Sequence, residues 1–102
     1  MKKHTFYSLL MNGYKKEYAQ KWNGYTDGTF NYYKNEFGYW YAIEPTTGMS
    51  VINYRSTRKE CENAAHAPGF LEKVQNALTT DLQERFKKLV EIAEKEELQK
   101  CS

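Results

Sequence analysis

The sequence predicts an α+β fold, in which an N-terminal antiparallel sheet of three to four strands packs on C-terminal helices, the last of them long and amphipathic. Three observations carry this prediction. Fourteen of the 16 aromatic residues lie in the first 54 positions. That half also contains β-rich runs separated by turn signals. After residue 57 the composition changes to Glu, Lys, Leu and Ala, with apolar residues at helical spacing. The 102 residues are sized for a single domain, 1–102, with 1–56 aromatic, basic and mainly β and 57–102 helical.

Four runs in the first half have the composition of strands and lie between turns. The runs are residues 6–11, 29–33, 37–43 and 49–54, which are rich in aromatic and β-branched residues. The dipeptides Asn12-Gly13, Asn23-Gly24 and Asp27-Gly28 are typical of tight turns. Residues 34–36 and 45–48 are expected to turn the chain between the later strands, the second with proline early and glycine late.

The segment 14–22 fits either a helix or a strand. Tyr14, Tyr18 and Trp22 are four residues apart, which suits one face of a helix, whereas tyrosine and tryptophan also suit strands. The spacing favours a short helix.

The sequence of the second half predicts three helical segments. Thr57 and Glu60 form a capping-box pattern for a first helix that ends near residue 65, before Pro68-Gly69. A second helix covers 70–78, and Thr80, with Gln83 three residues later, can cap a third that runs to about Lys100. Leu89 lies in the middle of the apolar stripe of this last helix, so Leu89→Ala is expected to cost roughly 2–5 kcal/mol.

The predicted sheet is apolar on both faces. In the run 37–43 one face carries Tyr39, Tyr41 and Ile43, and the other carries Trp40 and Ala42, because strand residues alternate sides. In 49–54 the alternation assigns Ile52 and Tyr54 to one face. The helices can cover only one side, so the second face needs another cover: the segment 14–22, a second copy of the chain, or a partner.

Catalytic and metal-binding patterns are not found. The sequence contains no CxxC, HExxH, GxSxG or phosphate-loop pattern, so no metal, cofactor or catalytic residue is predicted and the chain is expected not to be an enzyme. Cys61 lies between Glu60 and Glu62, and nearby anions raise the pKa of a thiol.

Location is predicted from the absence of targeting signals. No apolar run is long enough to cross a membrane or to serve as a secretory signal. The two cysteines, Cys61 and Cys101, are interpreted as reduced thiols of a cytoplasmic protein.

The charge distribution indicates where a partner binds. Residues 1–59 contain nine basic and four acidic side chains, a net charge of +5, whereas 60–102 carry a net charge of −3. Aromatic residues among positive charges are typical of protein-binding hot spots and of single-stranded nucleic-acid binders. The predicted partner-binding residues are Tyr39, Trp40, Tyr41, Lys15, Lys16, Lys21 and Lys34.

The sequence therefore predicts a small binding or inhibitory protein that acts on a protein or nucleoprotein, with homodimerisation left open. The alternative is a single-stranded nucleic-acid-binding protein that uses a basic, aromatic sheet face. In size, aromatic first half and lack of catalytic motifs the chain resembles the accessory proteins that phages and mobile elements use against host machinery, anti-CRISPR inhibitors among them. That resemblance rests on no residue motif and assigns no site.

Overall fold

A computed structural model describes residues 1–13 and 16–100 and has an α+β architecture. A five-stranded antiparallel sheet precedes the helices, one strand more than the upper limit predicted from the sequence. The strands are β1 (Lys2–Met11), β2 (Glu17–Thr26), β3 (Asn31–Lys34), β4 (Trp40–Ile43) and β5 (Ser50–Arg55), and the helices are α1 (Arg58–Ala65), α2 (Phe70–Ala77) and α3 (Thr80–Lys100). None of the described helices is long and apolar enough to cross a membrane.

The helix favoured for the segment 14–22 is wrong for its described part, which belongs to β2. All ten residues of β2 pair with β1, from Lys2 opposite Thr26 to Met11 opposite Glu17. The four-residue spacing of Tyr18 and Trp22 also fits a strand, because residues i and i+4 share one face of a strand as well. Tyr14, the first residue of the supposed helical face, lies outside the described residues.

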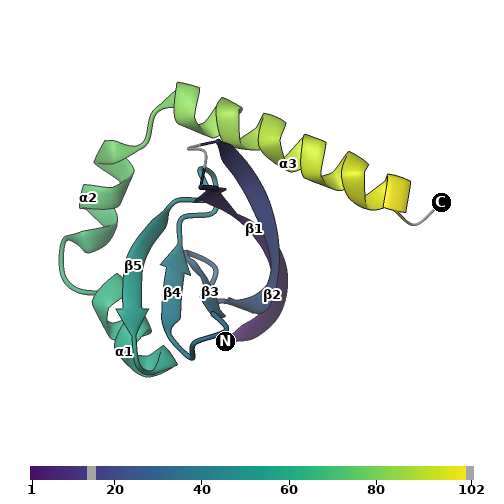
Figure 1. Cartoon of the computed structure of the whole chain (residues 1–102). Helices are drawn as coiled ribbons and strands as arrows, with labels where there is room; N and C mark the ends of the chain where they lie inside the picture. The colour runs from purple at the N-terminus through teal and green to yellow at the C-terminus, as the bar shows by residue number, and fades with distance from the viewer. Residues whose placement is uncertain (14–15, 101–102) are drawn as a thin grey trace.

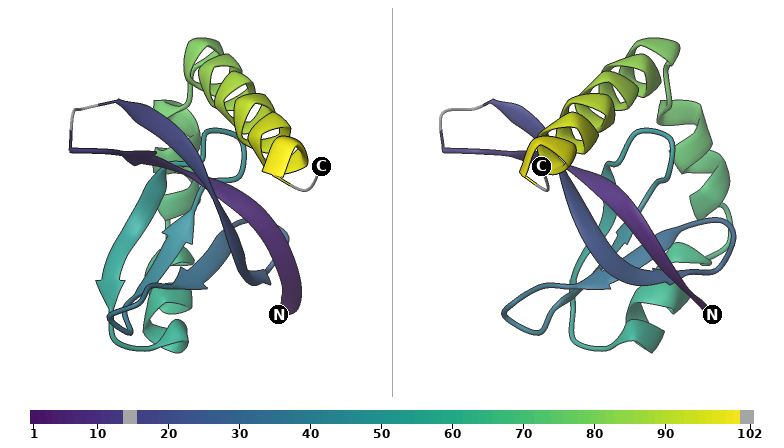
Figure 2. Two further views of the ribbon diagram at one scale, coloured as in Figure 1. Left: turned by 45° about the vertical axis from the view of Figure 1, so that its right-hand side comes forward. Right: turned by 90° about the vertical axis from the view of Figure 1, so that its right-hand side faces the viewer.

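The five strands follow one another in sequence order, but β1 and β2 form a long ribbon that leaves the rest of the sheet. Only Tyr25 and Thr26 of β2 pair with β3, opposite Tyr32 and Asn31. Gly24 stands where the ribbon departs, and a Cβ at that position would lie 2.1 Å from the Tyr32 carbonyl oxygen. Figures 1 and 2 show the ribbon curving along one side of β3–β5, with α1 and α2 on the other side.

Both faces of the sheet are buried within the same chain. On the helix side, the sheet residues of one core pack against α1 and α2: Phe30, Tyr32, Ala42 and Ile52 with Cys61, Ala65 and Val74. On the ribbon side, a second core contains Phe6, Tyr33, Tyr41 and Ile43, with Trp22 packed against it. The predicted two-sided apolar character is therefore confirmed, and the ribbon supplies the second cover.

The helix boundaries follow local capping signals. The Thr57 hydroxyl accepts a hydrogen bond from the Glu60 backbone N–H at 3.1 Å, as the capping-box pattern predicts. At the start of α3 the hydroxyl of Thr79, not of Thr80, accepts a bond from the Leu82 N–H at 3.2 Å. In α3, Phe86 is buried, whereas Leu89 is only half-buried and Ile92 is 53% exposed, so the expectation that Leu89 is a full core residue is wrong.

Candidate functional site

A row of stacked aromatic rings crosses the ribbon side of the sheet. Trp22 of β2 stacks on Tyr33 with ring centres 4.0 Å apart, and Tyr33 stacks on Tyr41, its partner across the strands, at 5.1 Å. Tyr54 meets Tyr41 edge-on at 5.4 Å, and Tyr39 meets Tyr54 at 6.0 Å. We call Tyr33, Tyr39, Tyr41 and Tyr54 the tyrosine face.

The tyrosine face has a buried base and an exposed outer end. Tyr33 and Tyr41 are 6% and 9% exposed, whereas Tyr39 is 42% and Tyr54 is 70% exposed. Phe37, which precedes Tyr39 in the β3–β4 loop, is 77% exposed. Large apolar side chains exposed together in this way indicate an interaction surface.

One side chain, Asn35, holds the loop that carries Phe37 and Tyr39. Its Oδ1 accepts hydrogen bonds from the backbone N–H groups of Phe37 at 3.0 Å and Tyr39 at 2.9 Å. Its Nδ2 donates to the Tyr41 hydroxyl at 3.1 Å. The loop is therefore fixed to the base of the tyrosine face, and an ordered loop loses less conformational entropy when a partner binds.

Tyr54 reaches this face because β5 is irregular. The pairing of β4 with β5 shifts between Ala42 opposite Ile52 and Trp40 opposite Arg55, which leaves an extra residue in β5. Tyr54 has a φ of +57°, a left-handed conformation that costs a non-glycine residue about 1–2 kcal/mol. The side chain of Tyr54 therefore points to the ribbon side of the sheet, whereas Ile52 points to the helix side. The sequence-based assignment of both residues to one face is wrong. Strained residues of this kind cluster at functional sites.

The phenol groups at the base of the face are harder to ionise than a free tyrosine. Burial, and then the neighbouring hydroxyls of Tyr41, Tyr54 and Tyr18, raise the pKa of Tyr33 to about 12. Burial and Tyr54 also raise the pKa of Tyr41. At neutral pH these groups are uncharged and can both donate and accept hydrogen bonds.

The structure brings together only part of the set of binding residues predicted from the sequence. Tyr39 and Tyr41 belong to the tyrosine face. Lys34 is exposed, but it is paired with Trp40 across β3 and β4 and so lies on the opposite face of the sheet. Trp40 points the other way, packs against the helix-side core and lies 6.2 Å from the ring of Tyr25. The sheet thus separates Trp40 from its two neighbours, as strand alternation predicts.

The other predicted lysines do not join the tyrosine face either. Lys21 pairs with Glu97 of α3 at 2.8 Å, and Lys16 lines a groove between β2 and α3. Lys15 lies outside the described residues. Sequence reasoning did not select Tyr54 or Phe37 as site residues. It assigned Phe37 to the strand run 37–43, whereas β4 begins at Trp40 and Phe37 lies in the loop before it.

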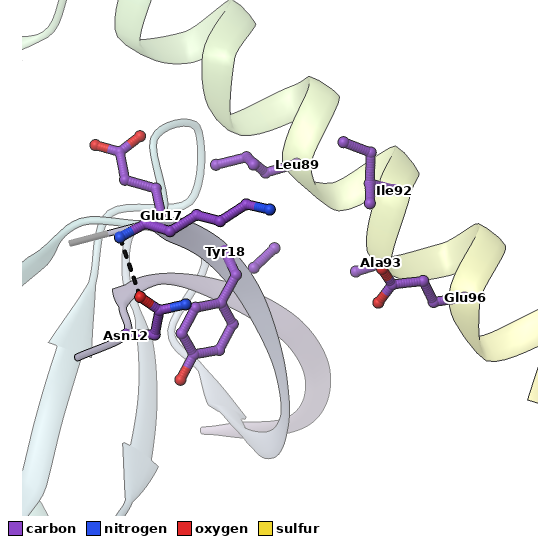
Figure 3. A pocket seen from close by; sticks show the side chains of 9 residues that line it. Asn12, Glu17, Tyr18, Leu89, Ile92, Ala93 and Glu96 are labelled. Carbon is purple, nitrogen blue, oxygen red and sulfur yellow. Dashed lines mark hydrogen bonds between the residues drawn. The ribbon is translucent and has the colours of Figure 1, made fainter. Parts of the chain in front are cut away.

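The groove between the ribbon and α3 is a second candidate site, with a volume of about 500 Å³. Figure 3 shows Leu89, Ile92, Ala93 and Glu96 of α3 opposite Asn12, Glu17 and Tyr18. Two ion pairs bridge the elements along it, Arg85 with Glu17 at 3.1 Å and Lys21 with Glu97 at 2.8 Å. The residues that line the groove carry charges of both signs, so no single ligand charge is favoured there.

Groups suited to catalysis or metal binding are few. Within residues 1–13 and 16–100 no group of three or more His, Cys, Asp or Glu side chains could hold a metal ion. Burial raises the pKa of the Cys61 thiol to about 11, which keeps it protonated and a poor nucleophile at neutral pH.

The Asp27 carboxylate accepts hydrogen bonds from the Thr29 and Phe30 backbone N–H groups at 2.8 Å. It also contacts two side chains, the Tyr32 hydroxyl at 2.6 Å and Nε2 of His66 at 2.5 Å. These contacts join the β2–β3 turn to the end of α1. We interpret the cluster as structural, because its contacts link two separate elements.

Comparison of the chain with models of protein families, with curated proteins and with solved structures finds no match. The function is therefore inferred from the chain's own residues.

Proposed function

We propose that the chain is a small, non-enzymatic binding protein whose tyrosine face, with Phe37, docks onto a protein. The observation that carries this proposal is a preorganised aromatic surface: Tyr54 is 70% exposed and held in a left-handed conformation, beside a loop fixed by Asn35. Tyrosine offers a large, rigid and amphipathic contact area and is enriched in binding hot spots.

In this proposal the chain acts in the cytoplasm as an inhibitor or adaptor, and the partner is a protein or a nucleoprotein. An accessory role of the kind that phage and mobile-element proteins play is compatible with a chain whose exposed aromatics can block a surface of the partner. The free thiol of Cys61 agrees with a reducing compartment.

The proposal predicts that truncating the exposed end of the face abolishes capture of the partner. The tagged protein, Tyr54→Ala and a control, Leu98→Ala, are used to capture proteins from a lysate, followed by mass spectrometry. Leu98 is 72% exposed but lies on α3, away from the tyrosine face. Truncating Leu98 therefore tests for non-specific hydrophobic binding. A partner should be retained by the wild type and Leu98→Ala and lost with Tyr54→Ala, whose affinity falls about 30-fold or more.

Equal recovery of the same proteins by all three baits contradicts the proposal. Each capture is repeated after nuclease treatment. A partner that leaves with the nucleic acid indicates a nucleoprotein, and one that stays indicates direct protein binding.

The alternative function, binding of single-stranded nucleic acid, is favoured by one observation: the exposed rings of Tyr39 and Tyr54 lie together at one end of the sheet. Bases stack on such rings, and the affinity then falls steeply between about 50 and 200 mM salt. Anisotropy of a labelled oligonucleotide over that range distinguishes the two functions, because a hot-spot protein interface depends only weakly on salt.

A further inference from the structure

The outer edge of β1 presents backbone groups to solvent. β1 stands at one end of the sheet order, and β2 is the one described strand that pairs with it. The N-terminal half of β1 runs along the outer side of the ribbon (Figure 2). In an antiparallel pair, the N–H and C=O groups of alternate residues point toward the neighbouring strand, and those of the other residues point away from it. An edge strand therefore offers half of its backbone groups to a further strand.

Two hydrogen bonds show which residues of β1 point outward. The Asn12 N–H donates to the Lys16 carbonyl across the hairpin at 3.0 Å, so the even-numbered residues face β2. The Leu9 N–H donates to the Gly48 carbonyl of the β4–β5 turn at 2.7 Å, so the odd-numbered residues face away from β2. The register with β2 is unbroken over Lys2–Met11, which extends this alternation along the whole strand.

The open part of this edge is short and centred on Thr5. Leu9 already uses its N–H, which leaves Lys3, Thr5 and Tyr7 with outward N–H and C=O groups that bond no described part of the backbone. Lys3 and Tyr7 are equally far from Thr5 along the strand. A twofold axis at Thr5 therefore allows the same stretch of a second copy to pair with every one of these groups.

We propose that two copies of the chain pair through β1 and form a dimer in which the two sheets are continuous. The two β1 strands run antiparallel about Thr5, so that Lys3 of one copy lies opposite Tyr7 of the other. The outward groups of the two strands then bond to each other, as in any addition of a strand to a sheet edge. This inference goes beyond the proposed function, which needs only the tyrosine face.

The acidic surroundings of Tyr7 favour a second copy over an arbitrary extended segment. Burial, and then Glu97, raise the pKa of the Tyr7 hydroxyl, and Glu94 adds to this effect, whereas Lys21 lowers the pKa. Both glutamates of α3 therefore lie near Tyr7. Glu97 is paired with Lys21, but exposed Glu94 forms no ion pair within residues 1–13 and 16–100.

Lys3 is the cation that this register brings to Glu94. It is exposed and has no ion pair in the described part of the single chain. Opposite Tyr7 of the second copy, it approaches the carboxylate that the single chain leaves unpaired, and the twofold axis repeats the contact. The contact also joins the basic residues 1–59, with a net charge of +5, to the acidic residues 60–102, with a net charge of −3.

The proposed dimer leaves the tyrosine face exposed. β1 and β5 stand at opposite ends of the sheet order, and Tyr54 belongs to β5. A dimer then presents two tyrosine faces, and a partner with two sites is bound more tightly than by a single chain. Tyr54→Ala should leave the dimer intact, so the dimer and the proposed function are tested separately.

The first test measures the mass of the full chain in solution by sedimentation equilibrium over a range of concentrations. We expect the mass to rise toward twice the 12.1 kDa of the chain. Thr5→Pro removes the central outward N–H from both copies and should weaken dimerisation about 10-fold or more. The fold should persist, because that N–H does not bond β2 and an edge strand accepts proline in this position.

Thr5→Val is the matched control for the proline. It keeps the N–H and loses only the hydroxyl, which donates to Oδ1 of Asn23 at 3.0 Å, so it should dimerise like the wild type. Circular dichroism and the melting temperature check that the proline variant is folded.

A charge exchange tests the register independently of the proline. Lys3→Glu should weaken the dimer about threefold or more, because it sets a carboxylate against Glu94 of the other copy. The double variant Lys3→Glu, Glu94→Lys should restore the wild-type affinity. Lys2→Glu, a neighbouring charge reversal, should not be rescued by Glu94→Lys, because alternate residues of a strand point to opposite faces.

A cross-link tests the position of the axis. In the proposed dimer the two Thr5 residues form a hydrogen-bonded pair, with Cα atoms about 5.5 Å apart, a separation that a disulfide can bridge. Thr5→Cys in a chain that also carries Cys101→Ser should therefore give a covalent dimer on oxidation with diamide. Lys3→Cys in the same background should cross-link far less, because the two positions are roughly 13 Å apart along the strands.

Each contrary result is specific. A monomeric mass at every concentration overturns the inference. A dimer that Thr5→Pro leaves as strong as Thr5→Val, or one that Tyr54→Ala dissociates, places the contact on another surface and also overturns it. If positions 3 and 5 cross-link equally, or if Glu94→Lys fails to rescue Lys3→Glu, the strands do not pair about Thr5.

Discussion

Single residues in the β4–β5 turn decide how the elements meet. Glu44 is buried, and its carboxylate accepts hydrogen bonds from the backbone N–H and hydroxyl groups of Thr46 and Thr47, at 2.7–2.9 Å. Gly48 follows with a φ of +67°, and its carbonyl accepts a hydrogen bond from the Leu9 N–H at 2.7 Å. This turn therefore ties β1 to the far end of the sheet, and Phe86 of α3 packs on it.

Replacing Gly48 by alanine should lower the free energy of unfolding by more than backbone strain alone would. A Cβ at this position would lie 2.2–2.8 Å from three atoms of the Phe86 ring, which is itself buried. Overpacking of this kind costs about 1–3 kcal/mol, in addition to the strain of the left-handed backbone.

Gly28→Ala is the matched control, because Gly28 has a φ of +90° but nothing within 4 Å of an added Cβ. The free energies of unfolding in urea compare the two variants. If Gly48→Ala and Gly28→Ala lose the same free energy of unfolding, Phe86 moves aside in the Gly48 variant, and the contact between Gly48 and Phe86 does not constrain α3.

At the scale of elements, α3 is held to the ribbon unevenly along its length. Phe86, near its N-terminal end, is 7% exposed, whereas Leu89 is half-buried at the edge of the groove. Further along, the contact depends on the exposed Lys21–Glu97 pair, and such pairs contribute little because solvent screens them. The first half of the helix is therefore fixed by packing and the second half by weak polar contacts.

This difference predicts unequal costs for two truncations in α3. Phe86→Ala should cost about 3–5 kcal/mol, whereas Leu89→Ala should cost about 1–2 kcal/mol, less than the sequence suggested, because the leucine is only partly removed from water. Unfolding in urea measures the free energy lost by each variant, provided that the m-values equal that of the wild type. A loss at Leu89 equal to that at Phe86 would mean that the groove is closed and that the leucine is a core residue.

At the scale of the whole molecule, the Asp27 cluster joins the sheet to the helix layer. Burial raises the pKa of Asp27, but hydrogen bonds from the Phe30 N–H, Tyr32, His66 and the Thr29 N–H outweigh it and lower the pKa to about 2. Burial, and then Asp27 itself, raise the pKa of Tyr32. The cluster is thus built around an ionised carboxylate.

The lowered pKa makes stability depend on pH in the acidic range. A carboxylate with a pKa of about 2 in the folded state and 3.8 as its ordinary value contributes stability that is fully present above pH 4. That contribution disappears as the pH falls from about 4 to 2. After discounting for solvent at this partly exposed site, we expect a loss of about 1–2 kcal/mol.

Asp27→Asn should flatten the stability profile over this range, and the exposed Asp81→Asn serves as the control. Unfolding in urea at pH 7, 4, 3 and 2 measures the difference between the variants. If the wild type and Asp27→Asn lose stability in parallel below pH 4, the cluster does not stabilise the fold through its charge.

Sequence alone determined the elements whose signals are local. The helix start at Thr57, the break at Pro68-Gly69 and the long apolar stripe of α3 follow from capping and spacing within a few residues. The apolar character of both sheet faces and the separation of Trp40 from Tyr39 and Tyr41 follow from strand alternation, which is equally local.

Tertiary structure decided the rest, because it depends on contacts between residues far apart in the chain. Only pairing with β1 makes residues 17–26 a strand, and only the ribbon's fold over Tyr33 shows what covers the second face. The bulge in β5 turns Tyr54 away from Ile52 and onto Tyr41, so alternation fails at the residue that completes the candidate site. Alternation assumes regular pairing, and the register between two strands is set by the whole sheet, not by the sequence of either strand.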